Sequence, residues 1–201
     1  EWGSVVEDLT APTNGYRVVV ELAKVIDPDK TIALHDAGGS RGYRSPFWQA
    51  TQPRSYVGMG GMAAMGWSLG GAIGAKLGQP DKLVVHLLGD ASFGMVGMEL
   101  ETAVRMGLST LTIVVNNEGT GGGLMGMERP AGPPPDMAKL TGNWTMVAKG
   151  LGAYAERVED PSDIGAALQR AIAATEGGQA ALVEVMIKPM ATPDLPDDWS
   201  I

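Results

Sequence analysis

The sequence predicts an α/β domain, a three-layer α/β/α sandwich with a mostly parallel central sheet. Helical and extended segments alternate along most of the 201 residues, as they do where helices connect parallel strands. The extended segments are short apolar runs, so each strand is expected to be buried on both faces. Because this length suits one α/β domain and is short for two, residues 1–201 are expected to form a single domain.

Local signals set the expected limits of each element. Asn14 is a helix cap, and the Asp-Pro-Asp run at residues 27–29 ends that helix before the first strand. Gly107 closes the third helix, and Pro161 opens the last one. The expected helices span residues 14–26, 62–77, 98–106, 144–151 and 162–175. The expected strands span residues 31–35, 83–88, 111–115, 154–158 and 181–187.

Two further segments carry no helix or strand periodicity. Residues 118–142 contain seven glycines and four prolines, and a loop of this length in a compact domain is usually functional. Residues 188–201 carry three prolines and three aspartates and are expected to form an extended C-terminal tail. We expect both segments to close over bound cofactor and substrate, as active-site lids do when they exclude water.

Composition excludes several classes of partner. The formal net charge is −8 and no basic cluster occurs, which argues against binding to nucleic acid or to an anionic membrane. The absence of cysteine rules out disulfides and thiolate metal sites, and it fits a cytoplasmic setting. Residues 55–75 carry no charge, but they are rich in glycine and interrupted by polar and aromatic residues, unlike a membrane-spanning helix.

Polar residues directly follow three of the expected strands, at residues 35–40, 89–92 and 116–119. The carboxyl ends of parallel strands share one edge of a sheet, and ligands of open α/β sheets bind at that edge. We therefore expect the three segments to lie next to each other. Ala91 and Ser92 would offer backbone N–H groups to a phosphate at the start of the following helix.

The same strand ends supply oxygen ligands for a hard cation. Gly89 permits a tight turn before the Asp90 carboxylate, while Asn117 gives an amide oxygen and Gly119 a backbone carbonyl. Magnesium takes about six oxygens and prefers one or two carboxylates together with phosphate oxygens. The protein ligands would leave positions for phosphate oxygens and a water, so the residues alone predict a metal–diphosphate site.

The spacing of these residues resembles a known cofactor motif. Gly89-Asp90, followed 27 positions after the aspartate by the second residue of an Asn-Asn pair, is similar to the thiamine diphosphate motif of the acetolactate synthase and pyruvate decarboxylase superfamily. Ala91 departs from the pattern, since the family usually has a third glycine there. A lone Gly-Asp or Asn-Asn is usually a turn, and only their joint spacing after buried strands favours a cofactor site. The resemblance extends to residues 66–77, 92–95 and 99–105 and covers about residues 16–188.

The resemblance implies a C-terminal thiamine-diphosphate-binding domain that uses thiamine diphosphate and Mg²⁺. It implies Asp90, Asn117 and the Gly119 carbonyl as metal ligands. Met65 would support the bent cofactor, and the Ala63 carbonyl would accept a hydrogen bond from the 4′-amino group. The other expected cofactor contacts are Ala37, Gly38, Gly39, Ser40, Gly89, Ala91, Ser92 and Gly121.

Several candidate residues also have plainer interpretations. Without the resemblance, Met65 would be a core residue, and His35 and His86 lie on apolar strands and are expected in the core. Glu118 adjoins a metal ligand and is a candidate to reach the substrate. The glycine pattern at residues 58–63 is close to a dinucleotide fingerprint, but it lacks the preceding buried strand and the strand-ending acid, so no nicotinamide site is expected.

The resemblance further implies that this chain holds half of an active site. In the family a glutamate of a separate pyrimidine-binding domain activates the cofactor, and no segment here is similar to that domain. We therefore expect a partner, a larger subunit that carries the pyrimidine-binding domain, in a hetero-oligomer such as a heterotetramer.

The expected reaction makes or breaks a C–C bond next to a carbonyl, on 2-oxo acids or 2-hydroxyacyl-CoA. Residues 35–38, 46–48 and 94–98 most resemble the acetolactate-synthase-like branch that includes bacterial 2-hydroxyacyl-CoA lyases. Acetolactate synthesis and 2-oxo acid decarboxylation stay open as alternative reactions. Outside the enzymes, the alternative is a structural or regulatory subunit that binds the cofactor without turnover.

Overall fold

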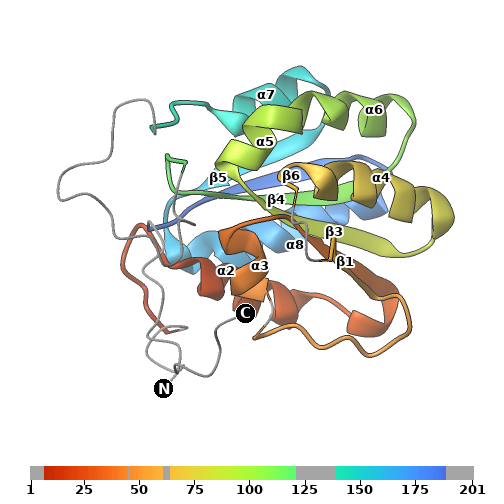
Figure 1. Cartoon of the computed structure of the whole chain (residues 1–201), viewed down its shortest axis with the longest axis horizontal. Coiled ribbons are helices and arrows are strands. Elements are labelled where there is room, and N and C mark those ends of the chain that lie inside the picture. Colours follow the sequence, from red (N-terminus) through yellow and green to blue (C-terminus); the bar gives the residue numbers. More distant parts are fainter. Residues whose placement is uncertain (1–6, 45, 61–63, 121–138, 189–201) are drawn as a thin grey trace.

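A single parallel sheet organises the chain. The computed structural model describes residues 7–44, 46–60, 64–120 and 139–188. The strands of these residues form one sheet in the order β2-β1-β3-β4-β6-β5, and every neighbouring pair is parallel (Figure 1). They are β1 (Thr31–His35), β2 (Tyr56–Val57), β3 (Leu83–Gly89), β4 (Thr110–Asn116), β5 (Tyr154–Val158) and β6 (Ala181–Met186). The predicted parallel α/β sheet is confirmed.

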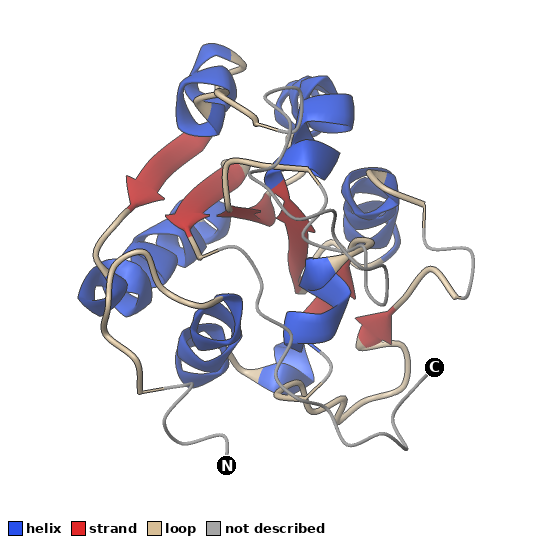
Figure 2. Ribbon diagram, turned by 60° about the vertical axis from the view of Figure 1, so that its left-hand side comes forward, coloured by secondary structure: helices blue, strands red, loops and turns tan. Residues whose placement is uncertain are grey.

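Helices cover both faces of this sheet and complete the three layers (Figure 2). One face carries α2 (Gly15–Val25), α3 (Gly39–Arg44) and α8 (Ile164–Glu176). The other face carries α4 (Trp67–Gly78), α5 (Asp90–Val96), α6 (Leu100–Arg105) and α7 (Trp144–Gly150). Short 3-10 helices are η1 (Pro28–Lys30), η2 (Gly97–Glu99) and η4 (Pro161–Asp163).

The side chains of β3 show how the core is divided between the two faces. Val85 and Leu87 pack into the apolar cluster that contains the buried faces of α2 and α8, whereas Val84 and Leu88 belong to clusters on the opposite face. All four side chains are fully buried. A strand covered on both faces needs apolar residues at every position, which is why these strands are continuous apolar runs in the sequence.

Two helices begin later than the sequence predicted. The helix expected from residue 62 starts at Trp67, because Gly66 has a left-handed backbone (φ 88°) and the Asp36 carboxylate accepts hydrogen bonds from the backbone N–H groups at that start. The helix expected from residue 98 starts at Leu100, after α5 and η2. Neither α3 nor β2 was predicted, because elements of six and two residues are too short to show a periodicity.

Within the uncharged stretch at residues 55–75, the structure describes β2 and the first part of α4. No helix in the described ranges is long and apolar enough to cross a membrane. β2 is a half-buried pair of residues beside β1. The glycines that follow it therefore lack the long buried strand that a dinucleotide fingerprint requires.

Both histidines are core residues, as predicted. His35 is 5% exposed and His86 is fully buried. The two ring nitrogens of His86 lie 3.1 Å from Ser68 Oγ and 2.8 Å from Thr112 Oγ1. Burial lowers the pKa of His86 to about 4, so the ring is neutral at physiological pH.

Protonation of His86 should therefore make the fold sensitive to acid. Its pKa is about 4 in the folded chain and 6.5 ordinarily, so the unfolded chain binds more protons between these values and stability is lost as pH falls from about 6.5 to about 4. His86→Gln keeps a polar group between Ser68 and Thr112 but cannot titrate. Urea unfolding between pH 7.5 and 4.5 should show a shallower loss of stability for the variant. Parallel pH profiles for the two proteins would contradict the assignment.

Candidate functional site

The three predicted polar segments lie at the carboxyl ends of adjacent strands. They follow β1, β3 and β4, which are neighbours in the sheet (Figure 1). In the register of the sheet, His35 of β1 lies opposite Leu87 of β3, and Gly89 of β3 lies opposite Val115 of β4. The expectation that these segments share one edge of the sheet is confirmed.

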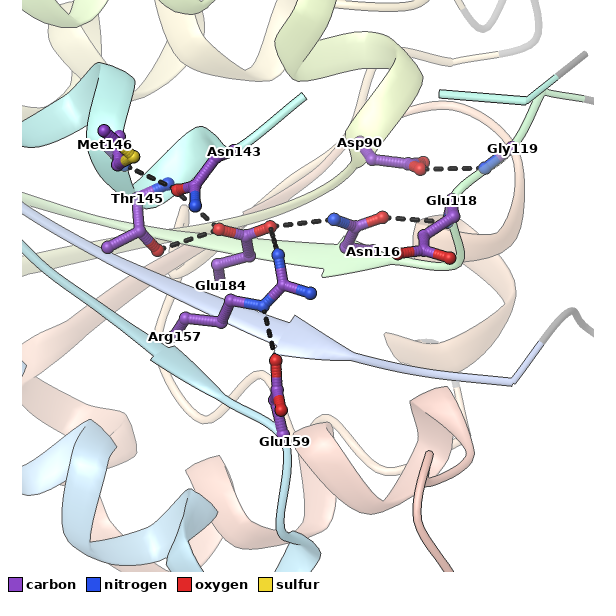
Figure 3. A network of polar contacts seen from close by, with 10 residues as sticks. All are labelled: Asp90, Asn116, Glu118, Gly119, Asn143, Thr145, Met146, Arg157, Glu159 and Glu184. Atoms are coloured by element: carbon purple, nitrogen blue, oxygen red, sulfur yellow. Dashed lines mark hydrogen bonds and ion pairs between the residues drawn. The ribbon is translucent and has the colours of Figure 1, made fainter. Parts of the chain in front are cut away.

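A hydrogen bond joins the two strand ends that were predicted to hold a metal ion. Asp90 is the first residue of α5 and is 2% exposed. Its Oδ2 accepts a hydrogen bond from the backbone N–H of Gly119 at 3.0 Å, and its Oδ1 accepts one from the N–H of Ala91 at 2.9 Å (Figure 3). Asp90 and Gly119 are 29 positions apart in the chain, so the predicted ligand positions come together only in the fold.

The Asp90 carboxyl is buried and held by backbone N–H groups. Burial raises its pKa to about 6, although backbone hydrogen bonds from Ala91 and Gly119 act in the opposite direction. The largest influences on this pKa are burial and backbone N–H groups, and no charged side chain is among them. A buried carboxylate without a cation is costly, and a divalent metal bound beside it would offset that cost.

Asn117 and Glu118 lie between these two ligand positions. Asn117 is half-buried, and its side chain forms no hydrogen bond with any residue that the structure describes. Its amide oxygen is therefore available to a ligand. Glu118 is exposed, with a left-handed backbone (φ 54°), and its role toward the substrate stays a prediction.

The donor set fits magnesium bound together with phosphate. Within the described ranges, no group of three or more histidine, aspartate or glutamate side chains is close enough to hold a metal ion. The expected ligands include one carboxylate, so further oxygens would have to come from a diphosphate and from water. Magnesium commonly has this arrangement in cofactor sites.

Gly89 does not form the tight turn that the sequence suggested. Its backbone is extended (φ −79°, ψ 161°), a conformation open to any residue. A Cβ atom added there would meet no atom of the described chain within 4 Å. The glycine thus leaves open space beside the start of α5. The N–H of Ala91, expected to face a phosphate, is bonded to Asp90 in this structure.

The other expected cofactor residues are placed as follows. Gly38 has a left-handed backbone (φ 68°) between β1 and α3, and Ser40 is buried, with its Oγ donating a hydrogen bond to the Ala37 carbonyl at 2.8 Å. Met65 is 44% exposed, so the plainer interpretation of it as a core residue is wrong. Ala63 and Gly121 lie outside the described residues, as do residues 121–138 and 189–201 of the expected lids.

Asp36 is a residue of this edge that the sequence analysis did not single out. Its carboxylate is fully buried and accepts hydrogen bonds from the backbone N–H groups of Gly66 at 2.8 Å and Ser68 at 3.0 Å. It therefore fixes the start of α4, and with it the position of Met65, to the end of β1. The available signal was its place directly after a buried strand, which is also the place of Asp90.

A second buried acid was missed in the same way. Glu184 lies in the middle of β6 and is fully buried, with Asn116 as one of its partners. It is the only acidic residue in the apolar run of that strand, and this was the signal in the sequence.

These features define the class of the protein. A parallel α/β sheet whose carboxyl edge carries a buried carboxylate, an available amide oxygen and open space beside a glycine has the features of an α/β ligand-binding domain. Comparison with known families shows which family this domain belongs to. Residues 36–185, well over half of the chain, match the model described as "Thiamine pyrophosphate enzyme, C-terminal TPP binding domain". The chain belongs to this family of thiamine-diphosphate-binding domains.

Curated relatives agree with this assignment. The chain is 30% identical over 189 residues to a "Probable acetolactate synthase" of Mycobacterium bovis, an alignment that covers 89% of this chain and 32% of the relative. It is 30% identical over 180 residues to a "2-hydroxyacyl-CoA lyase" of Saccharomyces cerevisiae, with the same coverage. It is 35% identical over 146 residues to the Arabidopsis thaliana enzyme of that name, covering 70% of this chain and 25% of the relative. The chain thus spans about a third or less of the length of these relatives.

The role of Asp36 can be tested through stability. Asp36→Asn keeps the size of the side chain, but one carboxylate oxygen becomes an N–H₂ group that faces a backbone donor. Loss of a buried hydrogen bond of this kind should lower the free energy of unfolding by about 2 kcal/mol. Chemical denaturation would measure it, with Asp81→Asn as the control because Asp81 is exposed in a turn. Equal losses in the two variants would contradict the capping role.

Proposed function

We propose that the chain forms the diphosphate- and magnesium-binding half of a thiamine-dependent active site that makes or breaks a C–C bond next to a carbonyl. The observation that carries this proposal is the contact of Asp90 with Gly119, which brings together the two ends of the cofactor motif. Family membership supports the cofactor. Relatives named as acetolactate synthases and 2-hydroxyacyl-CoA lyases support the type of reaction.

In this proposal the protein binds and orients, and the cofactor provides the reactive carbon. Bound thiamine diphosphate supplies a carbanion that adds to a carbonyl and stabilises the negative charge that follows. Asp90, Asn117 and the Gly119 carbonyl would hold Mg²⁺. The space beside Gly38 and Gly89 would admit the diphosphate, since a Cβ atom at either position meets nothing within 4 Å. Met65 would support the thiamine from the start of α4.

Substrates of two classes are compatible with the comparisons. Relatives with the printed name 2-hydroxyacyl-CoA lyase support a 2-hydroxyacyl-CoA substrate, and this agrees with the branch that the sequence motifs resemble. Relatives named acetolactate synthase support 2-oxo acids as the alternative. We favour the lyase, with carboligation of 2-oxo acids as the second candidate.

Catalysis would need a second component. We infer that the pyrimidine-binding domain and its activating glutamate lie in the part of the enzyme that this third of the relatives' length does not cover. The simplest arrangement is a larger partner subunit in a heterotetramer. A non-catalytic role as a structural or regulatory cofactor-binding subunit would instead require a partner that lacks this glutamate.

Cofactor binding should depend on a divalent metal. Titration of the assembled protein with thiamine diphosphate should show strong binding with Mg²⁺ and none after complete chelation by EDTA. Asp90→Ala removes the charged ligand and should abolish binding, while Asn117→Ala should weaken it by at least about tenfold, or about 1.4 kcal/mol. Asp81→Asn serves as the control. Undiminished affinity in EDTA would rule out the metal assignment.

The 201-residue chain alone should show no lyase or decarboxylase turnover, because the activating glutamate is expected elsewhere. Addition of a partner that carries the pyrimidine-binding domain should restore it, and a glutamine in place of that partner's glutamate should not. Product formation from each substrate class would be followed by chromatography. Turnover by the purified chain without any partner would refute the half-site proposal.

A further inference from the structure

Glu184 is a fully buried acidic side chain near the site, and both of its carboxylate oxygens have hydrogen-bond donors. It is fully buried on β6 and faces the helical layer that contains α7. Its Oε2 accepts hydrogen bonds from the backbone N–H of Thr145 at 2.9 Å and from the Thr145 hydroxyl at 2.8 Å. Its Oε1 accepts one from Asn116 Nδ2 at 2.7 Å and lies 3.4 Å from Arg157 Nη1 (Figure 3).

Asn116 links this carboxylate by hydrogen bonds to residues 117–119, which we call the metal loop. It is the last residue of β4 and is 2% exposed. Nδ2 donates to Glu184, and Oδ1 accepts a hydrogen bond from the backbone N–H of Glu118 at 2.8 Å. The carboxylate can only accept and the N–H can only donate, so these two partners permit a single orientation of the amide.

The metal loop needs this support because its backbone is in an unfavourable conformation. Glu118 has φ 54°, a region that residues with a Cβ atom rarely adopt. The loop is held there by Asn116 at the Glu118 N–H, by Leu140 N–H donating to the Glu118 carbonyl at 3.1 Å, and by the bond from Gly119 to Asp90. Asn117 lies in the chain between Asn116, which binds the Glu118 N–H, and Gly119, which binds Asp90. These contacts fix the backbone on both sides of Asn117 and so limit where its amide oxygen can point.

We propose that Glu184, acting through Asn116, is a positioning residue for the divalent cation. The chain of contacts runs from Glu184 through the Asn116 amide to the Glu118 N–H, and from there to the neighbouring ligand positions Asn117 and Gly119. Neither Glu184 nor Asn116 is a ligand itself. Outer partners of metal ligands typically change metal affinity by about 10–100-fold when they are altered. This inference rests on the proposed function, because it assumes that the loop holds a metal ion.

Glu184→Gln is the informative variant because it keeps the shape of the side chain. Its carbonyl oxygen still accepts from Thr145, but its N–H₂ group meets the N–H₂ group of Asn116. The asparagine must then turn or move, and its contact with Glu118 is lost. We expect the affinity for Mn²⁺, used as the probe in the thiamine diphosphate complex of the assembled protein, to fall by about 10–100-fold. Saturating Mn²⁺ should restore turnover, because the ligands themselves are intact.

A second substitution should reverse the effect. In the double variant Glu184→Gln with Asn116→Asp, the new glutamine amide donates to one oxygen of the new aspartate, and the other oxygen accepts from the Glu118 N–H. The contacts with Thr145 and with the Glu118 N–H and the net charge are retained, and only the 3.4 Å contact of Arg157 with Oε1 is lost, so Mn²⁺ affinity should recover to within about threefold of the original protein. The single variant Asn116→Asp places two carboxylates together and should be as weak as Glu184→Gln.

Controls separate positioning from folding and from the proposed function. Glu159→Gln alters an exposed acid that contacts Arg157 at the outer end of the same network, and it should leave Mn²⁺ affinity unchanged. Asn116→Ala removes both the bond to Glu184 and the bond to the Glu118 N–H, and it tests the same chain of contacts if Glu184→Gln does not fold. The melting temperature of each variant reports folding, and electron paramagnetic resonance of Mn²⁺ reports the site.

The outcomes are distinguishable. Weak Mn²⁺ binding in Glu184→Gln and Asn116→Ala, with recovery in the double variant, supports the positioning role. Unchanged Mn²⁺ affinity in both single variants, while Asp90→Ala abolishes binding, overturns the positioning role and leaves the proposed function in place. Unchanged Mn²⁺ binding in Asp90→Ala overturns the proposed function itself.

Discussion

The arrangement of the site depends on one constraint: carboxylates buried within or directly after parallel strands, each accepting hydrogen bonds from the chain around it. Asp36 fixes the start of α4, and Asp90 joins the start of α5 to the loop after β4. Glu184 holds the start of α7 and, through Asn116, the other side of that loop. Without these acceptors the backbone N–H groups of the edge would be buried and unsatisfied, at a cost of about 1–3 kcal/mol each.

Charge distinguishes these three carboxylates. Glu184 has an arginine at 3.4 Å, whereas neither aspartate forms an ion pair with another described residue. Burial of a carboxylate without an ion-pair partner is costly, and a divalent ion bound beside Asp90 would offset that cost. The backbone donors that keep Asp90 in place leave it without an ion-pair partner among the described residues, which agrees with the metal-binding role proposed for it.

Local signals in the sequence predicted the strands and the cofactor motif well. β1 and β5 have the predicted bounds, and Asn14 caps α2, because a short apolar run and a polar cap are properties of neighbouring residues. The start of α4 and the conformation at Gly89 were predicted wrongly. The α4 start depends on Asp36, 30 positions from Gly66, and the support of the metal loop depends on a pair 68 positions apart. Contacts between residues so far apart in the chain produce no periodic pattern in the sequence. A single acidic residue in or directly after an apolar strand is nevertheless a signal of a buried polar contact.

The strand order has a consequence for how the protein is made. β6 lies between β4 and β5, although it is the last of these strands in the chain, and β5 has no other partner in the described sheet. While the chain emerges from the ribosome, the edge of β4 stays unpaired and β5 cannot dock until β6 has been synthesised. An open edge of that kind favours pairing with other chains, and pairing of β6 with β4 removes it. Only then does Glu184 reach Asn116, so the hydrogen bond between β4 and β6 that supports the loop after β4 forms only after β6 has been synthesised.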